Sequence, residues 1–497
     1  MTIRDPHTGN GGQQDDALPG QQAFPGQTSF SGSDWDTKSR PMPALEYKKA
    51  IEKVVVTPVT TVEPAQPPLL PVSPKRHRHR GLVTLIVSAL LIVLIVIGSI
   101  LGQRLMSSGS IKTAFGGSAT INGAFVHPPL TAQQVASLHH LVSHMQYKQL
   151  ASLYVSHMSL DEELGQIIMV EYDDTYYSPD LDIMINKLHA GGVIMYEFQM
   201  QTAPQTAHDI AQMQAHAKLP LLVSSDEEGG IVHRLIHVYP PRPSALSVYQ
   251  SGNPDYAAQQ GHLVARDLKA VGINENLAPD VDVALIPDAP DQITRTYGFT
   301  TDSVIQYAGP YMRAMQQDGV VACIKHYPGL GDANIDAHFG LPVVNRTRDQ
   351  LYSVELAPFK HFIQSQNKLD NPGMIMPTDV LMPAIDPNMP AELSHTFMTD
   401  ILRHEFGYDG VALTDALYMQ GISKTWTMPQ AGVLALNAGN DMLLGPTGAD
   451  QMIAMLDGLK AALQNGTLAK SRLDEAATRI IALKMQYHLM PATPPQN

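Results

Sequence analysis

The stretch IKHYPGLGDANIDAHFGLP, residues 324 to 342, concentrates side chains that can bind polar groups and transfer protons. They are Lys325, His326, Asp332, Asp336 and His338. An imidazole titrates near neutral pH, and a carboxylate beside it can fix its tautomer and stabilise its cationic form. The spacing is therefore suited to acid–base chemistry, with an ordinary exposed loop as the alternative at this point.

Composition excludes several classes of function. Residues 103–497 carry 23 Lys and Arg against 39 Asp and Glu, so this part of the chain is acidic and unsuited to binding nucleic acid. Cys323 is the only cysteine in the sequence, which excludes an intramolecular disulfide and a thiolate metal cluster.

Eight short apolar runs alternate with helix-like segments between residues 159 and 490. They are IIMVEY (167–172), GGVIMY (191–196), LPLLVSSD (219–226), INENLAPDVDV (273–283), VVACIKHYP (320–328), MIMPTDV (374–380), GVALTDA (410–416) and DMLLGP (441–446). Intervening segments such as PDYAAQQGHLVARDLKAVG and MPQAGVLALNAG have helical periodicity and end at glycine. The pattern predicts an α/β fold, a TIM (β/α)8 barrel, with a doubly wound open sheet as the alternative.

A second feature is the segment GLVTLIVSALLIVLIVIGSILG, residues 81–102, which has no charged residue over 22 positions. At about 1.5 Å per residue it can cross a hydrocarbon core of about 30 Å, so we expect one transmembrane helix. The basic PKRHRHR before it indicates that the N-terminus is cytoplasmic and that the chain after about residue 103 is extracytoplasmic. We therefore expect a single-pass protein of the cell membrane.

The composition of the remaining segments indicates how the chain is divided. We expect a disordered cytoplasmic tail (1–80), a flexible stalk (103–128), a helical preface (129–158), the barrel domain (159–490) and a C-terminal tail (491–497).

Charged side chains end five of the eight runs. They are Asp226, Asp280 with Asp282, Lys325 with His326, Asp379 and Asp415. In a TIM barrel the ends of the strands meet at one face, where the active site lies. Solvation of a loop explains any single one of these charges but explains the joint pattern poorly, because an unpaired carboxylate is costly there.

The motifs in register resemble family 3 glycoside hydrolases, and within that family the single-domain β-N-acetylhexosaminidases of bacteria. They are SLDEELGQIIMV, DEEGGIVHR, NLAPDVDV, RTYG, KHYPGLGD with IDAHFGLP, ELSHTFMTDILRHEFGYDGVALTDAL and LNAGNDMLL, which together span residues 159 to 490. The resemblance implies a retaining mechanism that passes through a covalent glycosyl-enzyme intermediate.

The resemblance also implies roles for individual residues. Asp415 would be the nucleophile, His338 the general acid and base, and Asp336 the carboxylate that orients His338. The residues implied in substrate binding are Asp226, Arg234, Arg295, Lys325 and His326. Glu228 reads as structural, and the glycines at 329, 331 and 340 would allow the loop that carries His338 to move.

The chain departs from the family pattern at Thr296 and Tyr297, at Leu330, and at Pro377-Thr378-Asp379, where relatives often have T-A-H. The implied substrate is a glycan that contains N-acetylglucosamine, with no metal or organic cofactor. Two alternatives stay open: a β-glucosidase or β-xylosidase of the same fold, and a non-catalytic sugar-binding protein tethered to the membrane. Protein partners cannot be predicted from the sequence.

Overall fold

The computed structural model describes residues 146–285, 292, 294–333 and 335–492. The predicted tail, transmembrane helix and stalk, and the predicted preface up to residue 145, lie outside the described residues. The same holds for residues 493–497 of the predicted C-terminal tail. Within the described ranges, no helix combines the length and the apolar composition needed to cross a membrane.

Eight parallel strands close into a barrel in the order β1-β10-β9-β8-β7-β6-β3-β2. The strands are β1 (Ile168–Glu171), β2 (Gly192–Ile194), β3 (Leu222–Ser225), β6 (Glu275–Asn276), β7 (Val321–Tyr327), β8 (Met374–Pro377), β9 (Val411–Ala416) and β10 (Met442–Thr447). Each of the eight apolar runs contributes one strand. The predicted α/β barrel is therefore confirmed, and the open sheet is wrong because β1 pairs with both β2 and β10.

The fourth strand is shorter than the sequence suggests. The run 273–283 predicts a long strand, but only Glu275 and Asn276 form β6. Beyond them the chain still follows β7, since the N–H of Val281 donates to the carbonyl of Lys325 at 2.8 Å. This irregular extension places Asp280 and Asp282 beside β7 at the top of the barrel.

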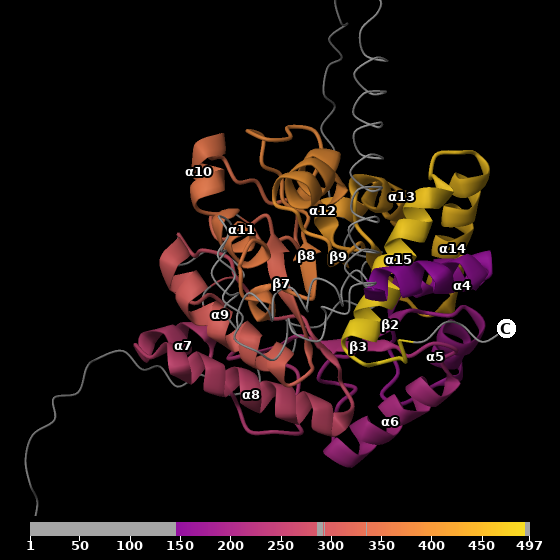
Figure 1. The fold of residues 1–497 in the computed structure, drawn as a ribbon, viewed down its shortest axis with the longest axis horizontal. Helices are drawn as coiled ribbons and strands as arrows, with labels where there is room; N and C mark the ends of the chain where they lie inside the picture. Colours follow the sequence, from indigo (N-terminus) through magenta and orange to yellow (C-terminus); the bar gives the residue numbers. More distant parts are fainter. Residues whose placement is uncertain (1–145, 286–291, 293, 334, 493–497) are drawn as a thin grey trace, which may run out of the picture. The chain divides into compact units, whose positions relative to one another are not determined.

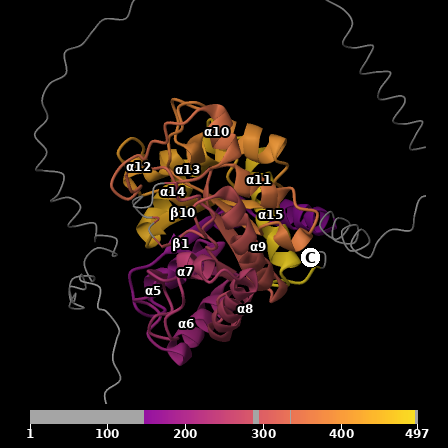
Figure 2. The same ribbon diagram turned by 90° about the vertical axis from the view of Figure 1, so that its left-hand side faces the viewer.

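Helices surround the barrel (Figures 1 and 2). The α-helices are α4 (Leu160–Gln166), α5 (Pro179–Asp182), α6 (Ala203–His216), α7 (Ala245–Gln250), α8 (Pro254–Val271), α9 (Thr301–Gln317), α10 (Arg348–Ser353), α11 (Ala357–Ile363), α12 (Gln420–Ser423), α13 (Met428–Ala438), α14 (Ala449–Gln464) and α15 (Lys470–Gln486). The two helical segments that the sequence predicts form α8 and α13. Helix α8 stops at Gly272, which has φ 95° and takes the left-handed conformation that glycine tolerates best.

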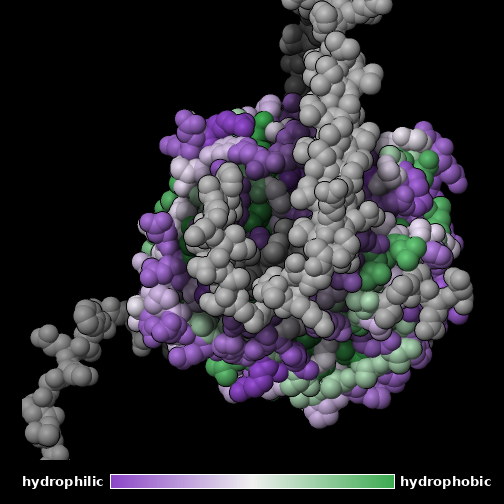
Figure 3. All heavy atoms as spheres, in the orientation of Figure 1, coloured by the Kyte–Doolittle hydropathy of each residue, from purple (hydrophilic) through white to green (hydrophobic). Residues whose placement is uncertain are grey.

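Shorter elements complete the domain. A hairpin of β4 (Glu227–Gly229) and β5 (Val232–His233) follows β3. The π-helices η2 (Ile183–Lys187) and η5 (Thr396–Glu405) and the 3₁₀-helices η3 (Lys368–Asp370) and η4 (Ala391–Leu393) lie between the larger elements. Residues 146–157 are helical, and Leu150 packs against the core. On the face shown in Figure 3, hydrophobic residues form small separate patches among hydrophilic ones.

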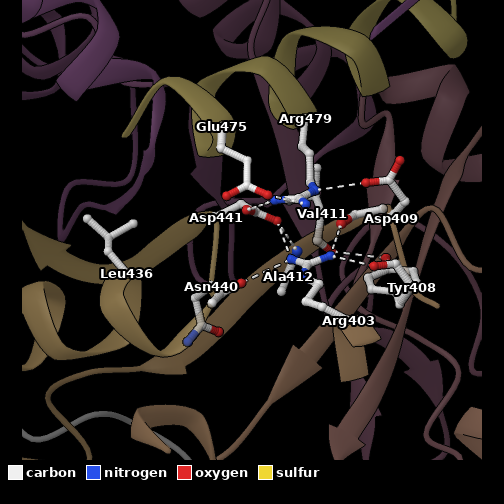
Figure 4. Close-up of polar contacts among 12 residues, drawn as sticks. Arg403, Tyr408, Asp409, Val411, Ala412, Leu436, Asn440, Asp441, Glu475 and Arg479 are labelled. Carbon is white, nitrogen blue, oxygen red and sulfur yellow. Dashed lines mark hydrogen bonds and ion pairs between the residues drawn. The ribbon is translucent and has the colours of Figure 1, made fainter. Parts of the chain in front are cut away.

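The N-terminal end of the barrel is held by a buried ionic cluster around Asp441, directly before β10. Figure 4 shows the guanidinium groups of Arg403 and Arg479 pointing toward this carboxylate. Asp441 accepts from Arg403 at 2.5 Å, from Arg472 at 2.7 Å and from Arg479 at 3.1 Å. Two cavities, of about 270 and 460 Å³, open beside this cluster, so they lie at the end of the barrel away from the predicted catalytic residues.

Candidate active site

Asp415 lies near the C-terminal end of β9, in the position predicted for the nucleophile. One carboxylate oxygen accepts a hydrogen bond from the hydroxyl of Thr378 at 2.8 Å, and the other accepts from the N–H of Ala416 at 2.9 Å. Its own N–H donates to the carboxyl group of Glu392 at 3.2 Å. Thr378, directly after β8, and Ala416 of β9 thus hold the side chain, while Glu392 of η4 holds the backbone.

Two further carboxyl groups surround Asp415. Burial, and then the charge of Asp415, raise the pKa of Asp379 well above its usual value. Burial raises the pKa of Glu392 in the same way, with added repulsion from Asp379 and Asp415. Burial and mutual repulsion therefore favour the neutral forms of Asp379 and Glu392.

The predicted substrate-binding residues that follow β3 and lie on β7 form a second network. The ammonium group of Lys325 lies 2.6 Å from Asp226 and 2.7 Å from Glu228. Arg295 donates two hydrogen bonds to Glu228, at 2.9 and 2.8 Å. Burial would raise the pKa of Glu228, but the charges of Arg295 and Lys325 outweigh it and hold that pKa well below its usual range.

Glu228 therefore does more than support a turn, because it links two cations for which the sequence implies substrate contacts. The sequence reading missed this role. An acidic residue next to a glycine pair looks the same whether it faces solvent or the barrel, so no local signal distinguished the two cases.

His326 is placed by a third set of contacts. Its Nδ1 lies 2.8 Å from Asp282, which also accepts from the N–H of Leu330 at 3.0 Å. Burial would lower the pKa of His326, but the hydrogen bond and charge of Asp282 raise it instead. The Nε2 atom lies 3.3 Å from a guanidinium nitrogen of Arg295, so both residues belong to one group.

Asp280, Asp282 and His326 are the described residues that could hold a metal ion, since one potential ligand atom from each lies within 4.8 Å of the others. The guanidinium group of Arg295 lies 3.9 Å from Asp280 and would repel a cation at this position. Burial and the charge of Asp282 raise the pKa of Asp280 well above its usual value, which keeps it neutral. The donor set therefore fits an internal hydrogen-bonded group better than a metal site.

Arg234 lies near Asp226 but is held mainly from the loop after β2. Its guanidinium group donates to Glu197 at 2.9 Å and stacks 5.5 Å from the centre of the Tyr196 ring. The charges of Arg234 and Lys325 lower the pKa of Asp226 in spite of its burial, which alone would raise it. Arg234 thus contributes its charge to the site that the sequence predicted for it.

The predicted Asp336–His338 pair forms on the loop after β7. Nδ1 of His338 lies 2.7 Å from the carboxylate of Asp336, which also accepts the N–H of His338 at 2.8 Å. Burial raises the pKa of Asp336, but the hydrogen bonds and charge of His338 outweigh it and bring that pKa below its usual value. The His338 side chain is 59% exposed, so it is accessible to a substrate.

The charge of His338 also lowers the pKa of Asp379, against burial and the charge of Asp415, which raise it. The imidazole is therefore within electrostatic reach of the carboxyl cluster around Asp415. Gly331, one of the three glycines for which the sequence implies movement of the loop, also has a packing role. A Cβ at Gly331 would lie 1.7 Å from the carbonyl oxygen of Val283, so this glycine permits close packing.

One group at the top of the barrel was not predicted. Glu171 ends β1 and accepts hydrogen bonds from Tyr196 at 2.8 Å, from Tyr418 at 3.1 Å and from Thr447 at 3.3 Å. Burial raises the pKa of Glu171 to about 7, although these hydrogen bonds act to lower it. The signal was present in the sequence, since the first apolar run also carries a carboxylate, Glu171, next to its last residue.

Comparison with known families decides the identity of the barrel. The model of the glycosyl hydrolase family 3 N terminal domain matches residues 159–483. The chain belongs to glycosyl hydrolase family 3. The resemblance inferred from the motifs is thereby confirmed, and β-hexosaminidases are among its curated relatives.

Among these relatives, Beta-hexosaminidase A of Pseudoalteromonas piscicida is 32% identical over 339 residues, which cover 62% of this chain and 56% of the relative. The Beta-N-acetylglucosaminidase/beta-glucosidase of Cellulomonas fimi is 29% identical over 340 residues, 66% of this chain and 58% of the relative. The family 3 chain thus spans little more than half the length of these two relatives.

A solved structure shows the same fold. The family 3 β-N-acetylglucosaminidase of Paenibacillus sp. str. FPU-7 aligns with a TM-score of 0.63 and 34% identity, over 67% of this chain and 63% of that one. This similarity agrees with the closed barrel described above.

Proposed function

We propose that this family 3 chain is a retaining exo-β-N-acetylhexosaminidase, which removes terminal β-linked N-acetylglucosamine from peptidoglycan fragments or chitin-like oligosaccharides. The observation that carries the proposal is the hydrogen bond between Asp336 and His338, which pairs an exposed imidazole with a carboxylate on the loop after β7. The names of the relatives in Pseudoalteromonas piscicida and Paenibacillus support the same class of substrate.

In the first step, a carboxylate oxygen of Asp415 attacks the anomeric carbon. The bond from that carbon to the leaving oxygen breaks, and the leaving oxygen takes the proton of His338. In the second step, water attacks the glycosyl-enzyme ester, gives its proton to His338 and releases the sugar and the Asp415 carboxylate. The hydroxyl of Thr378 and the N–H of Ala416 both donate to Asp415 and would hold it in place for both steps.

Asp226, Arg295, Lys325 and His326 would bind the hydroxyl groups of the terminal sugar. Their charges are balanced within the protein, because Glu228 and Asp282 accept from three of them. Charge-assisted hydrogen bonds to a neutral sugar require donors and acceptors that are held in fixed positions, which these buried contacts provide.

A β-glucosidase is the second candidate, because the Cellulomonas fimi relative is named for both activities. The membrane anchor at residues 81–102, with the barrel outside the cytoplasm, also remains a proposal, as does a glycan substrate outside the cell.

The test measures hydrolysis of 4-nitrophenyl β-N-acetylglucosaminide and the matching β-glucoside by the full chain in mild detergent. We expect faster cleavage of the N-acetylglucosaminide, and a loss of about 10³-fold or more in Asp415→Asn and about 10²-fold in His338→Ala. The control is Asp409→Asn, at the N-terminal end of the barrel. Faster cleavage of the glucoside would favour the second candidate, and an inactive wild type that binds N-acetylglucosamine oligomers would replace both with a binding protein.

A further inference from the structure

The two predicted catalytic residues lie on different segments that meet at one contact. Strand β9 carries Asp415 and leads directly into α12 and then Lys424. The ammonium group of Lys424 donates a 3.1 Å hydrogen bond to the backbone carbonyl of Phe339, the residue after His338. The segment that follows the candidate nucleophile therefore contacts the loop that carries the candidate acid and base.

Helix α12 is fixed at its other end by the carboxyl cluster. A Cβ at Gly421 would lie 1.9 Å from a carboxylate oxygen of Asp379, so the helix backbone packs directly on this side chain. Ile422 is fully buried in the same helix. Lys424 therefore extends from a rigid base whose position is set by the residues around Asp415.

The loop on the receiving side is open to solvent. The side chain of His338 is 59% exposed, and Phe339 is 69% exposed. The imidazole is held by Asp336 of the same loop at 2.7 Å, so its position follows the backbone of that loop. A Cβ at Gly340 would lie 3.7 Å from the amine of Lys424, which shows that this amine lies over the backbone at residues 339 and 340.

We propose that Lys424 is a positioning residue. It holds the loop of His338 so that the imidazole lies within reach of the leaving oxygen of a substrate whose anomeric carbon faces Asp415. This inference rests on the proposed function. A proton donor contributes to catalysis only within hydrogen-bond reach of the leaving oxygen, and a displacement of about 1 Å can cost up to about 10²-fold in rate. The bond of Lys424 is directed to a backbone carbonyl, so it controls the loop whatever side chain occupies position 339.

The experiment uses the full chain with Lys424→Met, which keeps the length of the side chain but removes the donor, and Lys424→Arg, which retains a donor. Lys187→Met is the matched control, since Lys187 is an exposed lysine on η2. Each variant is assayed with the 2,4-dinitrophenyl and the phenyl β-N-acetylglucosaminides. The dinitrophenolate ion leaves without protonation, whereas the more basic phenolate needs the proton of His338.

We expect Lys424→Met to lower kcat/KM about tenfold for the phenyl substrate and less than about twofold for the dinitrophenyl substrate. Lys424→Arg should restore most of the loss, and Lys187→Met should match wild type. An equal loss on both substrates would indicate general damage to the fold, and the proposal would then be wrong.

Hydrogen–deuterium exchange separates this proposal from the proposed function. Amides of residues 335–342 should exchange faster in Lys424→Met than in wild type and in Lys187→Met. If wild type hydrolyses neither substrate while this exchange still increases, the hydrogen bond from Lys424 holds the loop and only the assigned function fails. If the exchange of these amides is unchanged, Lys424 does not position the loop, whatever the hydrolysis data show.

Discussion

The buried carboxylate of Asp441 supports a prediction about stability. Asp441→Asn keeps the size of the side chain but removes the charge that three guanidinium groups share. Asp441 is fully buried and also accepts the N–H of Ala412 at 3.0 Å. Loss of the negative charge leaves Arg403, Arg472 and Arg479 next to a neutral amide at the N-terminal end of the barrel. Figure 4 shows Arg403 and Arg479 beside Asp441.

The magnitude follows from two independent arguments. Burial would raise the pKa of Asp441, yet the charges of Arg403, Arg479 and Arg472 lower it from 3.8 to about 2. At 1.36 kcal/mol per pKa unit this stabilises the folded state by about 2 kcal/mol at neutral pH. Removal of one partner from a buried ionic group typically costs about 3–5 kcal/mol, because the remaining charges are left unpaired. We therefore expect Asp441→Asn to lower the free energy of unfolding by about 2–5 kcal/mol.

Urea denaturation of the full chain, followed by tryptophan fluorescence and circular dichroism, measures this loss. Asp409→Asn is the matched control: Asp409 contacts Arg479 at 3.2 Å and Lys148 at 2.6 Å, but its side chain is 43% exposed. An exposed ion pair contributes about 1 kcal/mol or less, so the control should change little. The stabilisation from the lowered pKa is fully present above about pH 4 and is lost as the pH falls toward 2, so the difference between wild type and Asp441→Asn should shrink in acid. Equal midpoints for Asp441→Asn and Asp409→Asn at pH 7 would falsify the view that this charge holds the barrel closed.

Two further predictions concern single side chains. Thr378→Val removes the 2.8 Å hydrogen bond to Asp415. Because hydrogen bonds to charged groups contribute about 1.5–3 kcal/mol, kcat/KM should fall about tenfold or more, equally for the phenyl and dinitrophenyl substrates. A loss confined to the phenyl substrate would contradict a role of Thr378 at the nucleophile. Burial raises the pKa of Glu275 to about 8, so the wild-type fold loses stability as the pH rises from about 4.5 to 8, where the unfolded chain has released this proton and the folded chain has not. Thermal unfolding should therefore show Glu275→Gln gaining stability relative to wild type between pH 5 and pH 8, and a constant difference would show that Glu275 is ionised in the fold.

The eight strands could be predicted because each is a contiguous apolar run, which is a local property. For the same reason, Asp226, Lys325 and Asp415 could be identified from the sequence as charged residues at the ends of strands. For the fourth run only the predicted length of the strand was wrong. The segment with Asp280 and Asp282 runs beside β7 outside a regular strand and is joined to it by two backbone hydrogen bonds. The alternation of polar and apolar residues in the sequence cannot distinguish a regular strand from such an irregular extended segment.

What the sequence did not predict depends on contacts between distant residues. Glu228 lies 97 residues from Lys325, and Lys424 lies 85 residues from Phe339. Neither partner is at a fixed spacing, so no motif within one segment could reveal the pair. The role of Glu392 beside Asp415 was missed for the same reason, since its motif ELSHT gives no indication of which strand it contacts.

The same residue type therefore serves opposite purposes at the two ends of this barrel. Asp441 is buried at the N-terminal end, where three guanidinium groups keep it ionised and tie it to α15 and η5. Asp379 is equally buried at the C-terminal end, where burial and the neighbouring charge of Asp415 keep it neutral. A carboxyl group surrounded by cations is held ionised, whereas a buried carboxyl group beside another carboxylate is held neutral. The neighbours of each aspartate therefore set its protonation state: three arginines surround Asp441, whereas the carboxylate of Asp415 lies beside Asp379.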